Sequence, residues 1–266
     1  MSLISPQQLR ERLVGAGLLI IDARPLEAYE AGHIPGARHL DLYDYLVESN
    51  DPTGLEEMHA YLAQVFASAG VSGDEELVLY DETTGMRAAR GVWFLEYLGH
   101  PRVRQLEGGF RAWRAIGGAV SRDVPAAPRP ATFPLRPRPD ILATSDYVSN
   151  HLNRPEVLIL DIRSEGEHRG TQKADCCPRA GRIPGSLWLE WGPLIDPEGR
   201  LVDGEPARRR LADAGITPEK EIIVYCHRGA RAANTFLALK DLGFPRVRNF
   251  IGSWHEWSRR PDLPAD

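Results

Sequence analysis

The sequence EIIVYCHRGAR, residues 221–231, joins a β-branched apolar run to a loop that contains Cys226. The run at 221–225 is typical of a buried strand, and the Ala- and Leu-rich segment at 232–242 is typical of a helix. A strand, a short loop and a covering helix form the repeating unit of a parallel α/β sheet. The stretch therefore places Cys226 where the helix begins, at the carboxyl end of a strand.

This position favours negative charge. The first backbone N–H groups of a helix have no intrahelical partner, and the helix dipole adds partial positive charge there. Arg228 and Arg231 add two full charges, and Gly229 allows the backbone to curl so that several N–H groups converge. We interpret Cys226 as a cysteine whose thiolate is favoured, in a loop that attracts an oxyanion. The alternative is a buried structural cysteine that ends a central strand.

The chain contains an internal repeat. ELVLYD at 76–81 matches EIIVYC at 221–226, which begins 145 positions later. Three more pairs follow the same order, namely DAR at 22–24 with DIR at 161–163, HIPGA at 33–37 with RIPGS at 182–186, and GGFRAW at 108–113 with GSWHEW at 252–257. A repeat of this length predicts two copies of one domain and not a solenoid.

These motifs, in the same order twice, resemble the rhodanese family of sulfurtransferases in its tandem form. The resemblance spans nearly the whole chain and implies an α/β fold of two tandem rhodanese-like domains, each a parallel sheet flanked by helices on both faces. In that family the cysteine carries the transferred sulfur as a persulfide, which implies a catalytic role for Cys226. The resemblance also implies a substrate-binding role for the rest of the loop, His227, Arg228, Gly229, Ala230 and Arg231.

The loop of the first copy lacks a thiol. DETTGMR at 81–87 is one residue longer than CHRGAR at 226–231. Because a carboxylate cannot accept a sulfane sulfur and added acids repel an anion, we interpret the first loop as catalytically silent. We expect its domain to pack against the second and wall its pocket. Asp81 as a metal ligand or acid catalyst is the alternative, although no cluster at ligand spacing surrounds it.

A proline-rich stretch marks the domain boundary. Six prolines lie between Val124 and Pro139, which predicts an extended surface linker. The predicted organisation is an inactive rhodanese-like domain at 1–122, a linker at 123–139 and an active domain at 140–266. Ligands of such sheets bind at the carboxyl ends of the strands, where Cys226 lies.

Other motifs outside the loop have mainly structural interpretations. The two Ile-Pro-Gly segments are turn chemistry, and Trp254 and Trp257 are expected to pack as core or interface aromatics. Asp161 and Arg163 could support the loop from behind, although the equal placement of this motif in the silent half favours a scaffold role. Trp191 is a candidate border of the pocket.

The number of cysteines and the net charge indicate the compartment and the kinds of partner to expect. Three cysteines in 266 residues make no disulfide framework, which fits a reducing compartment. The net charge of −5 gives no general attraction to nucleic acid or anionic lipid. No apolar stretch approaches the roughly 20 residues of a membrane span, and the N-terminus does not resemble a signal peptide. We expect a cytoplasmic protein that binds neither nucleic acid nor membrane.

The adjacent cysteines 176 and 177 lie in a segment, 170–181, that the first copy lacks. They are candidates for a resolving thiol, a metal contact or a redox switch for Cys226. The plainer interpretation is that they are loop residues, since no partner ligands stand at metal spacing in the sequence. No metal site is therefore predicted.

Loop length and charge predict the reaction. Within the family, six-residue loops resemble those of sulfur-transferring members and longer loops those of phosphatases, and basic loops resemble those of thiosulfate enzymes. A compact dianion is best held by fixed positive charge, whereas a 2-oxo acid carries a single carboxylate. We predict a thiosulfate sulfurtransferase in which a Cys226 persulfide passes sulfur to cyanide or a thiol acceptor and sulfite is released. It needs no metal or organic cofactor. The alternatives are a 3-mercaptopyruvate sulfurtransferase and a persulfide carrier that delivers sulfur to a partner protein.

Overall fold

The computed structural model describes residues 2–13, 17–128, 131–192, 196–200, 202 and 204–266. The chain forms two compact units. Unit 1 comprises Met1–Tyr45, Glu57–Arg138 and Ile195–Leu201, and unit 2 comprises Leu46–Glu56, Pro139–Leu194 and Val202–Asp266. Each unit includes one segment from the other half of the sequence. A single boundary at the proline-rich stretch therefore does not separate the two units.

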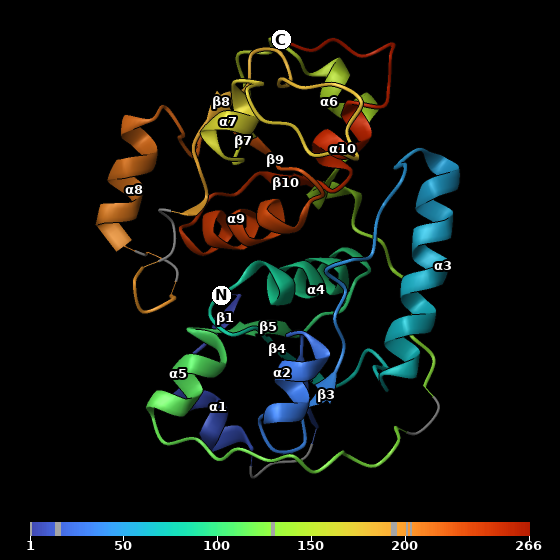
Figure 1. Cartoon of the computed structure of the whole chain (residues 1–266), viewed down its shortest axis with the longest axis vertical. Coiled ribbons are helices and arrows are strands. Elements are labelled where there is room, and N and C mark those ends of the chain that lie inside the picture. The colour runs from blue at the N-terminus through green and yellow to red at the C-terminus, as the bar shows by residue number, and fades with distance from the viewer. Residues whose placement is uncertain (1, 14–16, 129–130, 193–195, 201, 203) are drawn as a thin grey trace. The chain divides into compact units, whose positions relative to one another are not determined.

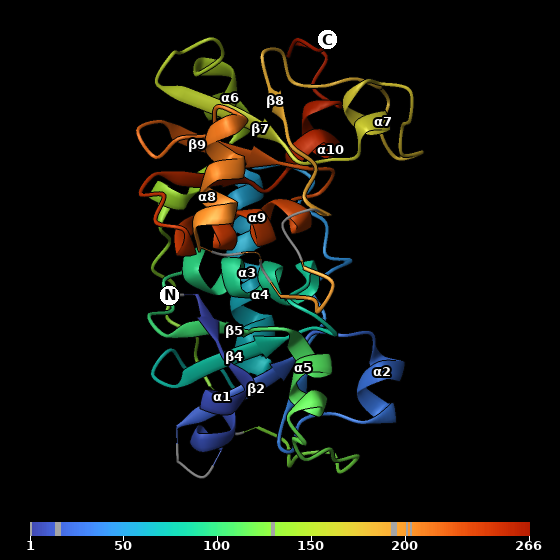
Figure 2. The ribbon, with the colours of Figure 1, turned by 90° about the vertical axis from the view of Figure 1, so that its left-hand side faces the viewer.

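Unit 1 is built on a five-stranded parallel sheet with the strand order β1-β5-β4-β2-β3. In chain order the elements of the first half are β1 (Leu3–Ile4), α1 (Pro6–Arg12), β2 (Leu18–Asp22), α2 (Leu26–Ala31), β3 (Arg38–His39), α3 (Pro52–Ser68), β4 (Glu76–Tyr80), α4 (Met86–Tyr97), β5 (Val103–Leu106) and α5 (Gly109–Ala115). Figure 2 shows β2, β4 and β5 as neighbours, with α4 on one side of them and α1 on the other.

Unit 2 repeats this topology, with five parallel strands in the order β6-β10-β9-β7-β8. Its elements are η1 (Pro139–Ile141), β6 (Leu142–Ala143), α6 (Ser145–Asn150), β7 (Val157–Asp161), α7 (Glu165–His168), β8 (Leu187–Trp188), α8 (Gly204–Asp213), β9 (Glu221–Tyr225), α9 (Ala230–Asp241), β10 (Val247–Phe250) and α10 (Ser253–Trp257). Figure 1 labels β7, β8, β9 and β10 of this sheet, with α9 beside β10. The predicted α/β fold with two tandem sheets is confirmed.

The register of the central strands explains why the motifs of each copy meet. Asp161 at the end of β7 pairs with Tyr225 at the end of β9, and Asp22 pairs with Tyr80 in the same way in unit 1. Parallel strands present their carboxyl ends at one edge of the sheet. The end of β7 therefore lies beside the loop that begins at Cys226.

The core of unit 2 lies on both faces of its sheet, because successive side chains of a strand point to opposite faces. Ile223 and Tyr225 pack in one cluster with Trp254 and Trp257 of α10, both of which are buried. Nine of the 12 residues of helix α9 are also buried. The two tryptophans were predicted to be core or interface aromatics, and the structure places them in the core.

The proline-rich stretch is attached to unit 1. Among its described residues, 123–128 and 131–138, no helix or strand forms, as the prolines predict. Phe133 is buried, however, and its ring lies 5.5 Å from that of Phe66. The backbone N–H groups of Arg136 and Arg138 donate to carbonyls at the end of α4. This stretch is therefore packed and hydrogen-bonded to unit 1 over part of its length. Residues 129 and 130 lie outside the described residues.

Candidate active site

The loop between β9 and α9, residues 226–231, is called here the cysteine loop. Strand β9 ends at Tyr225 and α9 begins at Ala230, so Cys226 precedes the helix by a short turn. Gly229 closes this turn at φ 79°, where L side chains are strained, and a Cβ there would lie 2.5 Å from the carbonyl oxygen of Ile251. Its backbone N–H donates to the Cys226 sulfur at 3.1 Å. The turn therefore points a backbone dipole at a buried sulfur, only 1% of Cys226 being exposed.

Helix α10 holds the cysteine loop from its other side. The N–H groups of Trp254 and His255 donate to the carbonyls of Cys226 and His227. Ser253 accepts the N–H of Cys226 at 3.0 Å, and its hydroxyl lies 3.9 Å from the Cys226 sulfur. Ser253 was not predicted as a site residue. The internal repeat could have indicated it, because Ser253 stands where the first copy has Gly109. Both residues have positive φ, at 52° and 60°.

Arg231 is fixed beside Cys226 by an acid that the sequence analysis missed. Its guanidinium forms two hydrogen bonds to the carboxylate of Glu167 on α7, at 2.8 and 2.9 Å. Burial opposes the charge of Arg231, but contacts with Glu167 and Cys226 raise its pKa above the ordinary value. Burial also opposes the charge of Glu167, yet Arg231 holds the pKa of that carboxyl at about 2. Both groups are therefore charged at neutral pH.

Glu167 has a sequence signal of its own. Ser164 accepts the backbone N–H of Glu167, and the Glu167 carboxylate accepts the backbone N–H of Ser164, which is a capping box. The motif predicts the start of α7 but not the partner of its glutamate, which lies 64 residues away at Arg231.

The remaining basic residue of the loop, Arg228, has no acidic partner in the part of the chain that the structure describes. It stands next to His227, whose pKa is lowered to about 4 by burial and by the charge of Arg228. His227 is therefore neutral at pH 7. Arg228 is left as the cation of the loop whose charge a bound anion would neutralise.

Asp161 and Arg163 form a buried network behind the loop. The Asp161 carboxylate accepts hydrogen bonds from Arg163 and the Tyr225 hydroxyl, both at 2.7 Å, and lies 2.9 Å from the Nδ1 of His168. Burial alone would raise the pKa of Asp161, but these partners lower it to about 2. Asp22, Arg24 and Tyr80 repeat part of the network in unit 1. Because it recurs beside a loop without a thiol, we assign the network to the scaffold.

Aromatic residues border this network. Trp188 donates its Nε1–H to the carbonyl of Arg163 at 2.8 Å, and its ring lies 6.0 Å from that of His168. The backbone N–H of Trp191 donates a hydrogen bond to the carbonyl of Ile162, the residue after β7. A pocket-bordering role for the Trp191 ring stays a prediction.

The two Ile-Pro-Gly segments are turns, as predicted. Gly36 and Gly185 have φ values of 78° and 70°, and Ile34 and Ile183 are fully buried. The backbone N–H of each isoleucine donates to a tyrosine hydroxyl at the end of the neighbouring strand, at 3.1 and 3.3 Å. The turns therefore tie the chain to the sheet and offer no catalytic group.

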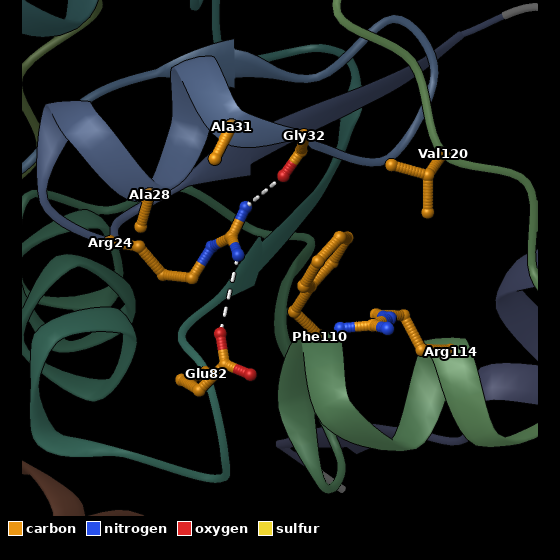
Figure 3. Close-up of a pocket in the computed structure, with 8 residues that line it drawn as sticks. All are labelled: Arg24, Ala28, Ala31, Gly32, Glu82, Phe110, Arg114 and Val120. Atoms are coloured by element: carbon orange, nitrogen blue, oxygen red, sulfur yellow. Dashed lines mark hydrogen bonds and ion pairs between the residues drawn. The ribbon is translucent and has the colours of Figure 1, made fainter.

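The loop of unit 1 at 81–87, called here the aspartate loop, holds its own carboxylate. Asp81 accepts the backbone N–H groups of Glu82 and Arg87 at 2.7 and 3.1 Å. A cavity of about 480 Å³ meets this loop at Glu82 and is also lined by Arg24, Phe110 and others (Figure 3). In this cavity the Arg24 guanidinium is paired with Glu82 at 3.2 Å and with the carbonyl of Gly32 at 2.7 Å (Figure 3).

The cysteine loop has the features of a nucleophile site. A buried sulfur receives a backbone N–H, two arginines stand in the same loop, and the carboxyl ends of parallel strands position all of them. Such surroundings favour a thiolate and stabilise negative charge that develops on a substrate. Fold and site together are those of an α/β protein that carries a buried thiol in a basic loop at the carboxyl edge of a parallel sheet.

Comparison with known proteins identifies the family. The model of the rhodanese-like domain matches residues 5–116 and again 144–260. The chain is 35% identical over 264 residues to a thiosulfate sulfurtransferase of Azotobacter vinelandii, covering 99% of this chain and 96% of that protein. The chain belongs to the rhodanese family of sulfurtransferases and carries two rhodanese-like domains.

Other relatives have different names. A probable 3-mercaptopyruvate sulfurtransferase of Pseudomonas aeruginosa is 33% identical, with 99% of this chain and 97% of that protein covered. The sulfur carrier protein TtuD of Thermus thermophilus is 32% identical, with 98% and 95% covered. A solved structure of a probable thiosulfate sulfurtransferase superposes with a TM-score of 0.77 at 35% identity, over 95% of this chain and 98% of that one. Among the described residues no helix is long and apolar enough to span a bilayer.

Proposed function

We propose that this chain is a thiosulfate sulfurtransferase that works through a persulfide on Cys226. The observation that carries the proposal is the charge of the cysteine loop. Arg228 has no acidic partner among the described residues, and the N–H of Gly229 points at the Cys226 sulfur. A small dianion such as thiosulfate fits fixed positive charge and converging N–H groups. The relative from Azotobacter vinelandii, named a thiosulfate sulfurtransferase, supports the proposal.

In the first half-reaction the Cys226 thiolate attacks the outer sulfur of thiosulfate. A new S–S bond forms, the S–S bond of thiosulfate breaks, and sulfite leaves with its electron pair. Arg228 and the loop N–H groups stabilise the charge that gathers on the departing sulfite. Arg231 is already held by Glu167 at 2.8 Å, so its role is to keep a positive edge beside the sulfur at a fixed place.

In the second half-reaction an acceptor takes the terminal sulfur. Cyanide attacks that sulfur, the Cys226 S–S bond breaks, and the thiolate returns as thiocyanate leaves. A thiol acceptor reacts at the same atom and leaves as its own persulfide. Both steps are displacements at sulfur, so neither needs a metal or an organic cofactor. A protein that supplies the acceptor thiol is a further candidate partner, in keeping with the relative named a sulfur carrier.

The runner-up donor is 3-mercaptopyruvate, which the relative from Pseudomonas aeruginosa favours. The single carboxylate of 3-mercaptopyruvate would neutralise only one positive charge of the loop, whereas the dianion thiosulfate would neutralise two. Steady-state kinetics with the two donors tests the proposal. We expect kcat/KM for thiosulfate to exceed that for 3-mercaptopyruvate at least tenfold, with parallel double-reciprocal lines for thiosulfate and cyanide. A preference for 3-mercaptopyruvate, or lines that intersect, would contradict it.

A further inference from the structure

Four side chains with soft or borderline donor atoms meet next to the cysteine loop. Cys176 and Cys177 come from the segment at 170–181, His227 from the cysteine loop, and His255 from α10. One ligand atom from each lies within 4.8 Å of the others. We call this group the thiol–imidazole cluster. None of its members is adjacent in sequence to the others except the two cysteines, which is why spacing along the chain did not reveal it.

The distances within the cluster suit a small ion. In tetrahedral zinc centres, Zn–S bonds of about 2.3 Å and Zn–N bonds of about 2.1 Å keep neighbouring ligand atoms roughly 3.3–3.8 Å apart. The Cys176 sulfur already lies 3.3 Å from the Nε2 of His227. The upper limit of 4.8 Å for the other pairs leaves about an ångström for side chains to close around an ion.

His255 has the environment of a ligand. It is 1% exposed, and its Nδ1 is buried without a hydrogen-bond partner among the described residues. Its Nε2 lies 3.4 Å from the carboxylate of Glu48 in the same unit. In metal centres a histidine commonly binds the ion through one ring nitrogen, while a carboxylate beside the other nitrogen fixes the ring. His255 has such a carboxylate beside Nε2 and leaves Nδ1 without a partner in the described part of the chain. A buried nitrogen without a partner otherwise weakens the folded state.

The backbone around the cysteines is also fixed. Lys173 donates to the carbonyl of Cys177 at 2.7 Å, and Arg259 donates to the carbonyl of Cys176. Arg179 anchors the segment by donating to four carbonyls around the end of α10, those of Trp257, Ser258, Arg260 and Leu263, at 2.8 to 3.0 Å. The two thiols are thus held against the helix that carries His255, which lowers the entropy lost when a ligand binds.

We propose that Cys176, Cys177, His227 and His255 form a binding site for one Zn²⁺ ion. Two thiolates and two imidazoles are the donor set of tetrahedral zinc, whereas calcium and magnesium require oxygen ligands. Binding forms two Zn–S and two Zn–N bonds and releases one proton from each thiol, with no change of oxidation state. The ion is not a cofactor of sulfur transfer.

Zinc at this site would restrain the cysteine loop. His227 is the residue after Cys226, so its coordination fixes the backbone beside the nucleophile and places the segment at 170–181 against the loop. This consequence, which rests on the proposed function, is reversible inhibition of sulfur transfer by zinc. The site then links the availability of a thiophilic metal to the activity of the enzyme.

The test is metal titration of the reduced full-length protein, after its three free thiols have been counted. We expect one Zn²⁺ per chain by calorimetry, and Co²⁺ should give the visible bands of a tetrahedral centre together with a thiolate charge-transfer band. Cys176→Ser is the main variant, because that side chain is exposed and its loss leaves the core intact. It should weaken zinc binding by at least about tenfold. Cys226→Ser is the matched control and should bind zinc like the wild type.

Two readouts keep this proposal separate from the proposed function. Metal binding is measured without any sulfur donor, so its outcome does not depend on which donor the enzyme uses. With donor present, zinc should inhibit the wild type and spare Cys176→Ser, and a chelator should restore activity. The proposal is wrong if no stoichiometric zinc binds, if Cys176→Ser binds zinc as tightly as the wild type, or if Cys226→Ser loses the site.

Discussion

The cysteine loop and the aspartate loop lie between equivalent strands and helices but treat negative charge differently. In the aspartate loop the backbone N–H groups of Glu82 and Arg87 donate to the chain's own Asp81 carboxylate. In the cysteine loop the N–H of Gly229 donates to a sulfur, and Arg228 has no acidic partner in the described part of the chain. The backbone of the loop thus offers an anion site in both units. The side chain at its first position decides whether that site is filled from within or open to a substrate.

The largest expected effect comes from exchanging the residues at that first position. Cys226→Ser should reduce sulfur transfer by at least about a thousandfold, because the hydroxyl does not form the persulfide on which both half-reactions depend. Thiocyanate formation from thiosulfate and cyanide measures this. Asp81→Cys is the reciprocal change and should add no activity, since Glu82 stays paired with Arg24 in that cavity. Turnover by the double variant D81C/C226S would show that the aspartate loop can carry the reaction once it has a thiol, which contradicts this difference between the loops.

The next effect concerns the charge beside the sulfur. Arg231→Ala should lower kcat/KM for thiosulfate by about a hundredfold, because it removes the fixed cation and leaves Glu167 as an unpaired carboxylate near Cys226. Glu167→Gln should cost less, since Arg231 keeps its charge. Arg87 is the matched control in unit 1, where it pairs with Asp41, and Arg87→Ala should leave kcat/KM unchanged. Equal losses for the variants at 231 and 87 would show that the anion is bound elsewhere.

A smaller effect, on stability, distinguishes the glycine of the cysteine loop, Gly229, from Gly243 in the turn after α9. Gly229→Ala should lower the free energy of unfolding by about 2 kcal/mol or more, because φ is 79° and the added Cβ meets the backbone of Ile251. Gly243→Ala has φ 91° but open space around the Cβ, so it should lose only about 1 kcal/mol. Urea unfolding at neutral pH measures both. A Gly243→Ala protein as unstable as Gly229→Ala would mean that the close approach at the cysteine loop contributes nothing.

The smallest effect depends on pH. His168 stands seven residues after Asp161 and lies 2.9 Å from its carboxylate, whereas unit 1 has Tyr29 seven residues after Asp22. Although burial opposes its charge, the partners of Asp161 lower its pKa from the ordinary 3.8 to about 2 in the folded protein, so the stability that the ionised carboxylate provides is full above pH 3.8 and is lost as pH falls through 2. His168→Gln should therefore lower the free energy of unfolding by about 1 kcal/mol at pH 5 and by little at pH 2. An equal loss at both pH values would contradict this assignment.

The sequence could predict the parts of the molecule that are encoded locally and twice. The strands that end at Tyr80 and Tyr225, the turns at Gly36 and Gly185 and the missing thiol at Asp81 all follow from short motifs whose chemistry decides the local structure. The repeat then places each motif at the same edge of a sheet. The fold, and the position of Cys226 at the end of a central strand, could for this reason be predicted from the sequence.

The partners of the loop were not accessible, because they come from distant parts of the chain. Glu167 lies 64 residues from Arg231, and Cys176 lies 51 residues from His227. Their meeting depends on how α7 and the segment at 170–181 pack, which no local pattern specifies. The assignment of residues 46–56 to unit 2 depends in the same way on long-range contacts, such as the hydrogen bond from the N–H of Asn50 to Glu256.

The proposed mechanism requires Cys226 to accept a sulfur atom from thiosulfate and to pass it on. The most direct test is the intact mass of the purified protein before thiosulfate, after it, and after the addition of cyanide, with Cys226→Ser treated in parallel. We expect the wild type alone to gain a single sulfur atom, which cyanide then removes. An unchanged mass with thiosulfate, or an equal gain on Cys226→Ser, would contradict it.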